Sequence, residues 1–281
     1  MAYRMDAAVF SIVMVAAALH ATWNAIVKAG HDSALTTAMV TGSAALIATM
    51  MLPFVPAPAR ASWPFLAASA ILSVGYYALV ARTYRVADMS RTYPLMRGTA
   101  PLLIAIASTA FLGDRLTVTA WCGVAVICAG IFCMIGGRRP GQGRGSGLAM
   151  LNAVVIAGYT LIDGAGVRRS GSPAGYTLWI FLLTGIPLLV WAIVGRGAAF
   201  RAYLGQHWRL GLVGGAGTTA SYGLALWAMT AASVVVVAAL RETSILFGTA
   251  LSAIVLKEHV DRSRLAATCA IAVGAAILRS A

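Results

Sequence analysis

The chain has 281 residues, of which 60% are hydrophobic and 10% charged, with a mean hydropathy of +0.85 and a formal net charge of +13. Soluble domains carry about 25% charged residues, so this composition excludes a water-soluble globule, a disordered chain and a fibrous protein, and it places the chain in a lipid bilayer. The basic residues separate apolar runs and do not alternate with aromatic residues, so the charge does not indicate nucleic-acid binding.

The first half of the chain contains five apolar runs of the length that a membrane-spanning helix needs, about 20 residues. The second run ends at Pro53, and Pro56 and Pro58 follow, which prevents the helix from continuing. The predicted helices of this half are residues 7–27, 34–52, 64–81, 91–112 and 116–135.

The second half begins after a Gly- and Arg-rich linker, residues 138–147, which separates a first repeat, 1–137, from a second, 148–281. Between Arg209 and Arg241 lie 31 uncharged residues, about 46 Å as one helix, which exceeds the roughly 30 Å hydrocarbon core. This run must therefore break, and we expect the turn at 230–233. The predicted helices are residues 148–167, 174–194, 210–229, 233–256 and 264–278, with the polar patch 196–209 as a separator.

The two halves are related by a shift of 144 residues. Under this shift, residues 112–116 lie over 256–260, Gly130 lies over Gly274, and Arg97 lies over Arg241. A unit of five spans has an odd number of crossings, so its copy enters the membrane from the opposite side. The sequence predicts an all-α polytopic membrane protein with ten transmembrane helices in two inverted five-helix repeats, which places substrate sites near the midplane. A chance alignment of two Leu- and Ala-rich halves is the alternative.

The chain combines ten predicted helices in two halves with the junction 113–116 (Gly-Asp-Arg-Leu) and a first helix that ends in Asn24 and Lys28. In these features it resembles the drug/metabolite transporter superfamily, specifically its EamA-type members, over essentially its whole length. The resemblance implies a transporter, and the superfamily's substrates range from amino acids and nucleotide sugars to organic cations and phosphorylated metabolites. The segments 20–28 and 163–168 also look like a subset linked to phosphonate metabolism.

The chain departs from the family pattern at three positions. Asp114 stands where the family favours Glu, Lys257 stands where Gly is usual, and His20 stands where an aromatic residue is common. The resemblance implies that both termini are inside the cell. The positive-inside rule favours both termini outside, because residues such as Arg82 and Arg201 would otherwise lie outside. The orientation is therefore left open.

Polar residues within the predicted spans are candidates for a site. His20, Asn24 and Lys28 occur at i, i+4 and i+8 with Trp23 beside them, so they share one helical stripe. This stripe either bonds to neighbouring helices, with Lys28 reaching the interface, or forms a cavity wall with His20 as a substrate contact or proton carrier. Asp163 either pairs with arginines 168 and 169 at the boundary or couples transport to protons.

Aromatic residues recur at similar places in the two halves. Tyr76 and Tyr77 in the third predicted helix have a counterpart in Tyr222 of the eighth. Such residues are either packing and interfacial anchors or groups that stack on a substrate. The spacing of Gly211 and Gly215 predicts close helix contact without any chemistry.

Two arginines are predicted to lie within the bilayer. The uncharged runs 98–113 and 243–256 are about 24 Å and 21 Å long as helices, so neither spans the core without Arg97 or Arg241. An arginine at this depth seldom faces lipid. Glu242 can neutralise one of the two, but one carboxylate cannot pair fully with both. We expect Arg97 and Arg241 to bind a carboxylate or phosphonate of the substrate, with Glu242 holding an arginine or engaging an amino group.

No phosphate-binding loop, nucleophile elbow or zinc signature occurs, so we expect no cofactor and no metal. The four cysteines (Cys122, Cys128, Cys133 and Cys269) are expected to be dispensable packing residues. The sequence favours a secondary transporter, not an enzyme, which moves a small polar metabolite by alternating access across the cell's inner membrane as a monomer or homodimer. The alternative is a membrane-embedded enzyme that acts on a lipid-linked substrate with Glu242 and His20 as its acid–base pair, or a flippase for such a substrate.

Overall fold

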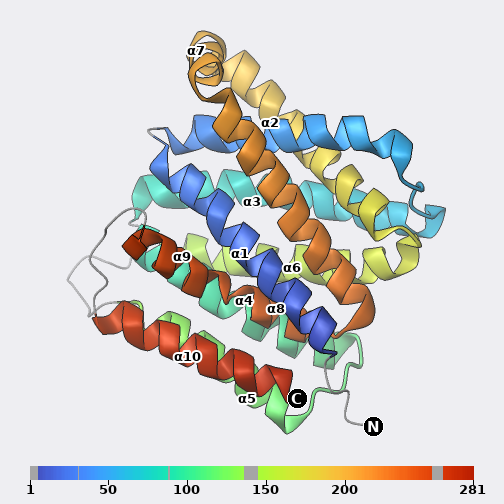
Figure 1. The fold of residues 1–281 in the computed structure, drawn as a ribbon, viewed down its shortest axis with the longest axis vertical. Helices are drawn as coiled ribbons and strands as arrows, with labels where there is room; N and C mark the ends of the chain where they lie inside the picture. The colour runs from blue at the N-terminus through green and yellow to red at the C-terminus, as the bar shows by residue number, and fades with distance from the viewer. Residues whose placement is uncertain (1–5, 31, 88, 136–144, 255–261) are drawn as a thin grey trace.

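A computed structural model describes residues 6–30, 32–87, 89–135, 145–254 and 262–281, and within these ranges the chain is a set of packed helices without strands (Figure 1). The all-α class predicted from the sequence is confirmed. The helices are α1 (Ala7–Ala29), α2 (Ser33–Met51), α3 (Trp63–Val86), α4 (Met89–Phe111), α5 (Val118–Phe132), α6 (Ser146–Ser170), α7 (Pro173–Ala231), α8 (Val234–Arg241), α9 (Ser244–Ile254) and α10 (Arg262–Arg279), with the short 3-10 turns η1 (Leu52–Phe54) and η2 (Arg60–Ser62) between α2 and α3.

Helix ends fall where side chains can replace the missing backbone partners. The Asp32 carboxylate accepts hydrogen bonds from the backbone N–H groups of Ala34 and Leu35 at 3.0 Å, which fixes the start of α2. Ser172 does the same for α7 by accepting from Gly175 N–H at 3.1 Å, with Pro173 as the first helical residue. The predicted end of the second helix before Pro53 is confirmed, because α2 ends at Met51.

The outer surface is apolar, as a bilayer requires. Seven helices within the described residues are long and apolar enough to cross a membrane, and the 59-residue α7 is one of them. Large hydrophobic side chains are exposed along this surface, among them Leu46, Ile71, Ile106, Val118, Val190, Val213 and Val273. A water-soluble monomer rarely exposes so much apolar surface, so these side chains face lipid. The total of ten spans stays a prediction.

Helix α7 corrects the expected separator at 196–209. That patch is helical, and the backbone leaves helical geometry only at Arg196, with φ −134° and ψ 25°. Glycines on both sides of Arg196 lower the cost of a kink there, while the polar side chains that follow are compatible with a helix. In Figure 1 the chain doubles back at this kink, so that α7 consists of two legs. The predicted turn at 230–233 is confirmed between α7 and α8.

The predicted helix 233–256 is also corrected. The chain forms α8 up to Arg241 and restarts as α9 at Ser244, with Glu242 and Thr243 in a turn between them. The N–H groups of Glu242 and Thr243 donate to carbonyls three residues earlier, at 3.1 and 3.0 Å, so the last turn of α8 is tightened. Interrupted helices are tolerated at membrane depth where the free backbone lines protein or a cavity.

The packing of α5 against α10 shows the repeat directly. A methyl group added at Gly130 would lie 3.1 Å from the Ala267 carbonyl and 3.3 Å from Ile271, while one added at Gly274 would lie 3.0 Å from the Gly123 carbonyl and 2.6 Å from Ile127. Each contact maps onto the other under the shift of 144 residues. The two helices run antiparallel, since Gly123 near the start of α5 also meets the end of α10 (Figure 1). A local two-fold between antiparallel helices lies perpendicular to them, which is the geometry of an inverted repeat.

Helix α2 packs against both legs of α7 through small residues. A methyl group at Gly185 would lie 2.5 Å from the carbonyl oxygen of Thr41, and these two residues are themselves separated by 144 positions. A residue that meets its own counterpart lies on the pseudo-two-fold axis. On the other leg, Gly211 and Gly215 lie against Met39 and Ser43, which confirms the close helix contact predicted from their spacing.

Candidate functional site

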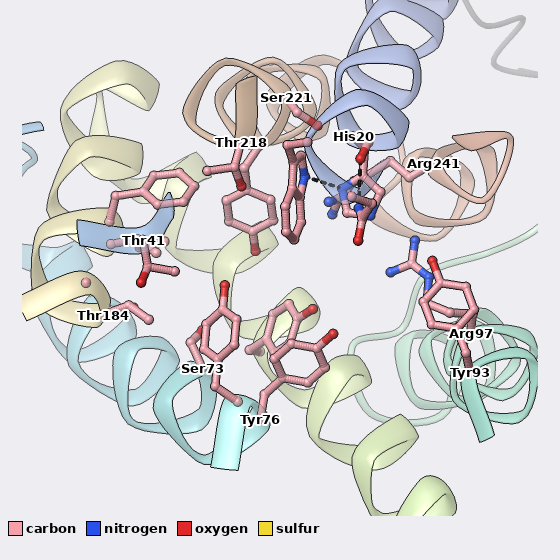
Figure 2. Close-up of a pocket in the computed structure, with 18 residues that line it drawn as sticks. His20, Thr41, Ser73, Tyr76, Tyr93, Arg97, Thr184, Thr218, Ser221 and Arg241 are labelled. Carbon is pink, nitrogen blue, oxygen red and sulfur yellow. Dashed lines mark hydrogen bonds between the residues drawn. The ribbon is translucent and has the colours of Figure 1, made fainter. Parts of the chain in front are cut away.

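A cavity with a volume of about 100 Å³ opens between the two halves (Figure 2). One water molecule needs about 10–15 Å³ by this measure, so the space accommodates a small solute. Its walls come from seven helices, and they are formed by His20, Trp23, Asn24, Thr41, Ser73, Tyr76, Tyr77, Tyr93, Arg97, Tyr159, Ile180, Phe181, Thr184, Gly185, Thr218, Ser221, Tyr222 and Arg241.

The structure brings the residues selected from the sequence together. Eight of the nine line this one cavity, from α1, α3, α4, α7 and α8, and the ninth, Glu242, is paired with a residue that lines it. The sequence prediction missed Tyr93 and Tyr159, which also line it. Each precedes a buried charged residue by four positions, Arg97 and Asp163 respectively, so the one-turn spacing could have identified both.

Arg97 and Glu242 form a buried ion pair beside the cavity. The Arg97 Nε donates to Glu242 Oε2 at 2.9 Å, and the two side chains are only 10% and 6% exposed. Arg97 is presented by α4, whereas Glu242 stands in the break between α8 and α9, so the pair connects the two halves. Of the two arginines that Glu242 could neutralise, it neutralises Arg97.

Arg241 lies in the cavity wall without a carboxylate. Its guanidinium carbon sits 4.9 Å from the centre of the Tyr222 ring, and it has no ion pair or hydrogen bond to any described residue. The repeat explains this asymmetry, because under the shift of 144 residues Glu242 corresponds to Gly98. A Cβ atom at Gly98 would lie 2.8 Å from the Phe132 ring, so the second half supplies a carboxylate where the first half packs tightly. Among the residues that line the cavity, Arg241 is therefore the arginine that no described carboxylate contacts directly.

His20, Trp23 and Asn24 form a connected group on α1. Trp23 Nε1 donates to His20 Nδ1 at 3.2 Å, and Asn24 Nδ2 donates to the His20 carbonyl at 2.7 Å. Because Nδ1 accepts, the neutral imidazole carries its proton on Nε2. This arrangement orients His20 as a hydrogen-bond donor and leaves the Asn24 oxygen available as an acceptor. The side chain of Lys28 and the second junction, 256–260, lie outside the described residues.

Asp163 does not pair with the neighbouring arginines, so the first of its two sequence interpretations is wrong. Arg168 donates from Nε to the Met229 carbonyl and from Nη2 to the Ala232 carbonyl, both at 2.8 Å, and Arg169 donates to the Ala165 carbonyl at 2.9 Å. The reason is helical geometry. At 3.6 residues per turn, positions five and six residues apart point about 140° and 120° apart, so both arginines leave the Asp163 face.

The fully buried Asp163 instead accepts hydrogen bonds from two tyrosines of α7. The Tyr176 hydroxyl donates to Oδ1 at 3.1 Å, and the Tyr222 hydroxyl donates to Oδ2. Tyr222 is thus shared between this carboxyl group and the face contact with Arg241. The other tyrosines form an aromatic wall, in which Tyr76 meets Tyr77 and Tyr159 edge-on at centroid distances of 5.3 and 6.0 Å.

The cavity has two chemically different ends. Figure 2 shows Arg97 and Tyr93 at one end and Thr41 and Thr184 at the opposite end, with His20 and Arg241 nearer the first. The buried Thr184 hydroxyl has no hydrogen-bond partner in the structure. A buried polar atom without a partner is costly, so the second end is suited to a polar group of a bound molecule.

These features define a multi-pass helical membrane protein with a polar cavity between its halves that two arginines line. The chain belongs to the EamA-like transporter family, whose model matches residues 8–136 and 143–280 and so covers two repeats. It is therefore a membrane transporter. No curated protein matches the chain.

Twenty-eight chains of solved structures match this one. A crystal structure among them superimposes with a TM-score of 0.71 over 96% of this chain and 95% of its own length, at 18% identity. At this identity the likeness concerns the fold alone.

Proposed function

We propose that this protein is a secondary transporter that carries a small organic anion, with a carboxylate or phosphonate group, across the cell's inner membrane by alternating access. The observation that carries the proposal is Arg241, a guanidinium in the cavity wall without an anionic partner among the described residues, beside an Arg97 whose charge Glu242 already balances. A bound anion supplies the missing negative charge.

The geometry of arginine favours these two anionic groups. A guanidinium presents donors in a planar fork that matches a carboxylate or phosphonate with two parallel hydrogen bonds. His20 Nε2–H provides a further donor from α1. The unpartnered Thr184 hydroxyl at the far end favours a substrate with a second polar group on a short carbon skeleton.

The broken helix supports alternating access. Arg241 and Glu242 stand where α8 ends, so small changes at this turn reorient both side chains without unfolding a regular helix. Glu242 also bonds to Arg97 across the halves, and a contact of this kind has to change when the halves rock against one another.

The alternative of a membrane-embedded enzyme or flippase is less well supported. An enzyme needs Glu242 and His20 as an acid–base pair, but Glu242 Oε2 accepts from Arg97, and His20 Nδ1 accepts from Trp23. One oxygen of Glu242 and one ring nitrogen of His20 are therefore already engaged in the cavity wall, and no hydrogen bond joins the two residues to each other.

Uptake by purified protein in liposomes tests the proposal. Labelled pyruvate and methylphosphonate serve as anion probes, and tetramethylammonium serves as the cation probe. We expect at least one anion to be taken up and recovered chemically unchanged, with uptake lost in Arg241→Gln. Arg209→Gln is the matched control, because Arg209 also lies over an aromatic ring, at 5.4 Å from Trp208, but is exposed outside the cavity. Uptake of the cation alone, or chemical conversion of the probe, would contradict the proposal.

A further inference from the structure

Asp163 is a buried carboxyl group that transport of an anion alone does not require. Its side chain is fully buried in α6, and no described cation forms an ion pair or hydrogen bond with it. An ionised carboxylate is very costly in such a place unless it is paired, and a proton is the simplest way to neutralise it.

The groups around Asp163 come from α3, α6, α7 and α8. The hydroxyl groups of Tyr176 and Tyr222 of α7 donate to the two Asp163 oxygens. Ser69 of α3 is a close neighbour of the carboxyl group, and its buried hydroxyl forms no hydrogen bond of regular geometry. Tyr159 lies one turn earlier on α6 itself. Arg241 of α8 contacts the face of the Tyr222 ring, so it is connected to the carboxyl group through that residue.

We propose that Asp163 is a proton-binding site and that Tyr222 couples its protonation to anion binding at Arg241, which makes the transporter a proton–anion symporter. The inference rests on the anion site proposed above. It assigns to the Asp163–Tyr222–Arg241 group a function that the anion site by itself does not require, namely the coupling of transport to a proton gradient.

The coupling between protonation and anion binding follows because the Tyr222 hydroxyl has a single hydrogen to donate. When Asp163 is ionised, its oxygen accepts the Tyr222 O–H, so this hydrogen is unavailable to the cavity. When a proton from solution binds to the carboxylate, Asp163 becomes a donor to the Tyr222 oxygen. The phenol hydrogen is then free to turn towards an anion beside Arg241. No bond of the substrate changes, and one proton accompanies one anion.

Protonation and anion binding therefore strengthen each other by the same factor. One hydrogen bond to a charged group corresponds to about tenfold or more in affinity. Pyruvate is the probe, because α-carboxyl groups titrate far below neutrality and its single charge stays constant from about pH 6 to pH 8. We expect its affinity for the wild-type protein to rise about tenfold from pH 8 to pH 6.

Titration calorimetry in two buffers of different ionisation enthalpy measures proton uptake on pyruvate binding without any variant. A tenfold rise in affinity over two pH units corresponds to an average uptake of about half a proton per anion, so we expect about this value across the range. Binding of pyruvate without proton uptake overturns the inference and leaves the anion site intact, whereas an absence of binding at every pH, with methylphosphonate as well, overturns both. Affinity that depends on Na⁺ at constant pH, and not on protons, also overturns it.

Two variants separate the parts of the mechanism. Asp163→Asn replaces the carboxyl group with an amide that donates to Tyr222 as the protonated acid does, so we expect high, pH-independent affinity and retained counterflow, but no accumulation driven by a pH gradient. Tyr222→Phe keeps the ring under Arg241 and removes the hydroxyl, so affinity falls and its pH dependence disappears. Asp6→Asn, at the exposed start of α1 where Asn caps as well as Asp, is the control that retains both. Accumulation by Asp163→Asn in a pH gradient at the wild-type level overturns the inference.

Discussion

The Arg97–Glu242 pair gives the sharpest test of the interior electrostatics. Glu242→Gln keeps the shape of the side chain and one carbonyl acceptor but removes the only carboxylate that is bonded to Arg97 in the described structure. Both side chains are at most 10% exposed, so the remaining guanidinium stays buried without a counter-charge. Breaking one side of such a pair costs about 3–5 kcal/mol of unfolding free energy. The melting temperature should then fall by an amount on the order of 10 °C.

Thermal unfolding of purified protein in detergent measures this loss. The matched control is Asp32→Asn, which removes the charge from the Arg196–Asp32 pair, whose side chains are 47% and 33% exposed at the same 2.9 Å distance. Asn retains the helix cap, so this change should cost less than about 1 kcal/mol. The double variant Arg97→Gln, Glu242→Gln should recover part of the lost stability, because neither charge is then left alone. Equal shifts for the buried and exposed pairs, or additive losses in the double variant, would refute the reasoning.

Three further predictions concern the scaffold. Gly274→Ala should lower the melting temperature, because the added methyl group would lie 2.6 Å from Ile127. The control Gly248→Ala has open space around it in α9, so it should leave the melting temperature unchanged or raise it. Equal shifts for the two variants would contradict the α5–α10 contact. Arg168→Gln should cost about 1 kcal/mol through its partly exposed bonds to two carbonyls at the α7–α8 junction, measured by the same unfolding assay, and a neutral result would show that the junction holds without them. Replacement of the cysteines, all free thiols in the structure, should retain folding and uptake, and loss of either would contradict their assignment as packing residues (Cys122, Cys128, Cys133 and Cys269).

Much of the fold could be predicted because lipid imposes a simple rule on the sequence. Runs of apolar residues have to be helices of a certain length, so the excess length between Arg209 and Arg241 located the turn near Ala231. The sequence also indicated a break after residue 194, but it extended the break over 196–209, whereas only Arg196 leaves helical geometry. The break at Glu242 was beyond this rule, because it interrupts a segment whose residues are compatible with a helix and lies where Glu242 pairs with Arg97 of another helix.

The candidate site was predictable to the extent that charge is expensive in a membrane. Arg97, Arg241 and Glu242 stand out because apolar runs on either side leave them no route to water, and the structure places the two arginines in one cavity wall. Asp163 shows the limit of the same argument. The sequence identified a buried carboxyl group, but its partner depends on which helix faces it, and Tyr222 lies 59 positions away. Contacts across such separations follow from helix packing, which no local pattern contains.

The dissociation constant of a small anion for Arg241 variants tests the central claim most directly. The measurement compares pyruvate and methylphosphonate binding to the wild type, Arg241→Lys and Arg241→Gln, with Arg209→Lys as the control. Lysine retains the charge but lacks the planar fork, so we expect Arg241→Lys to bind the anion about tenfold or more weakly and Arg241→Gln more weakly still. If folded Arg241→Lys and Arg241→Gln proteins bind both anions as tightly as the wild type, the anion site is not at Arg241 and the account is wrong.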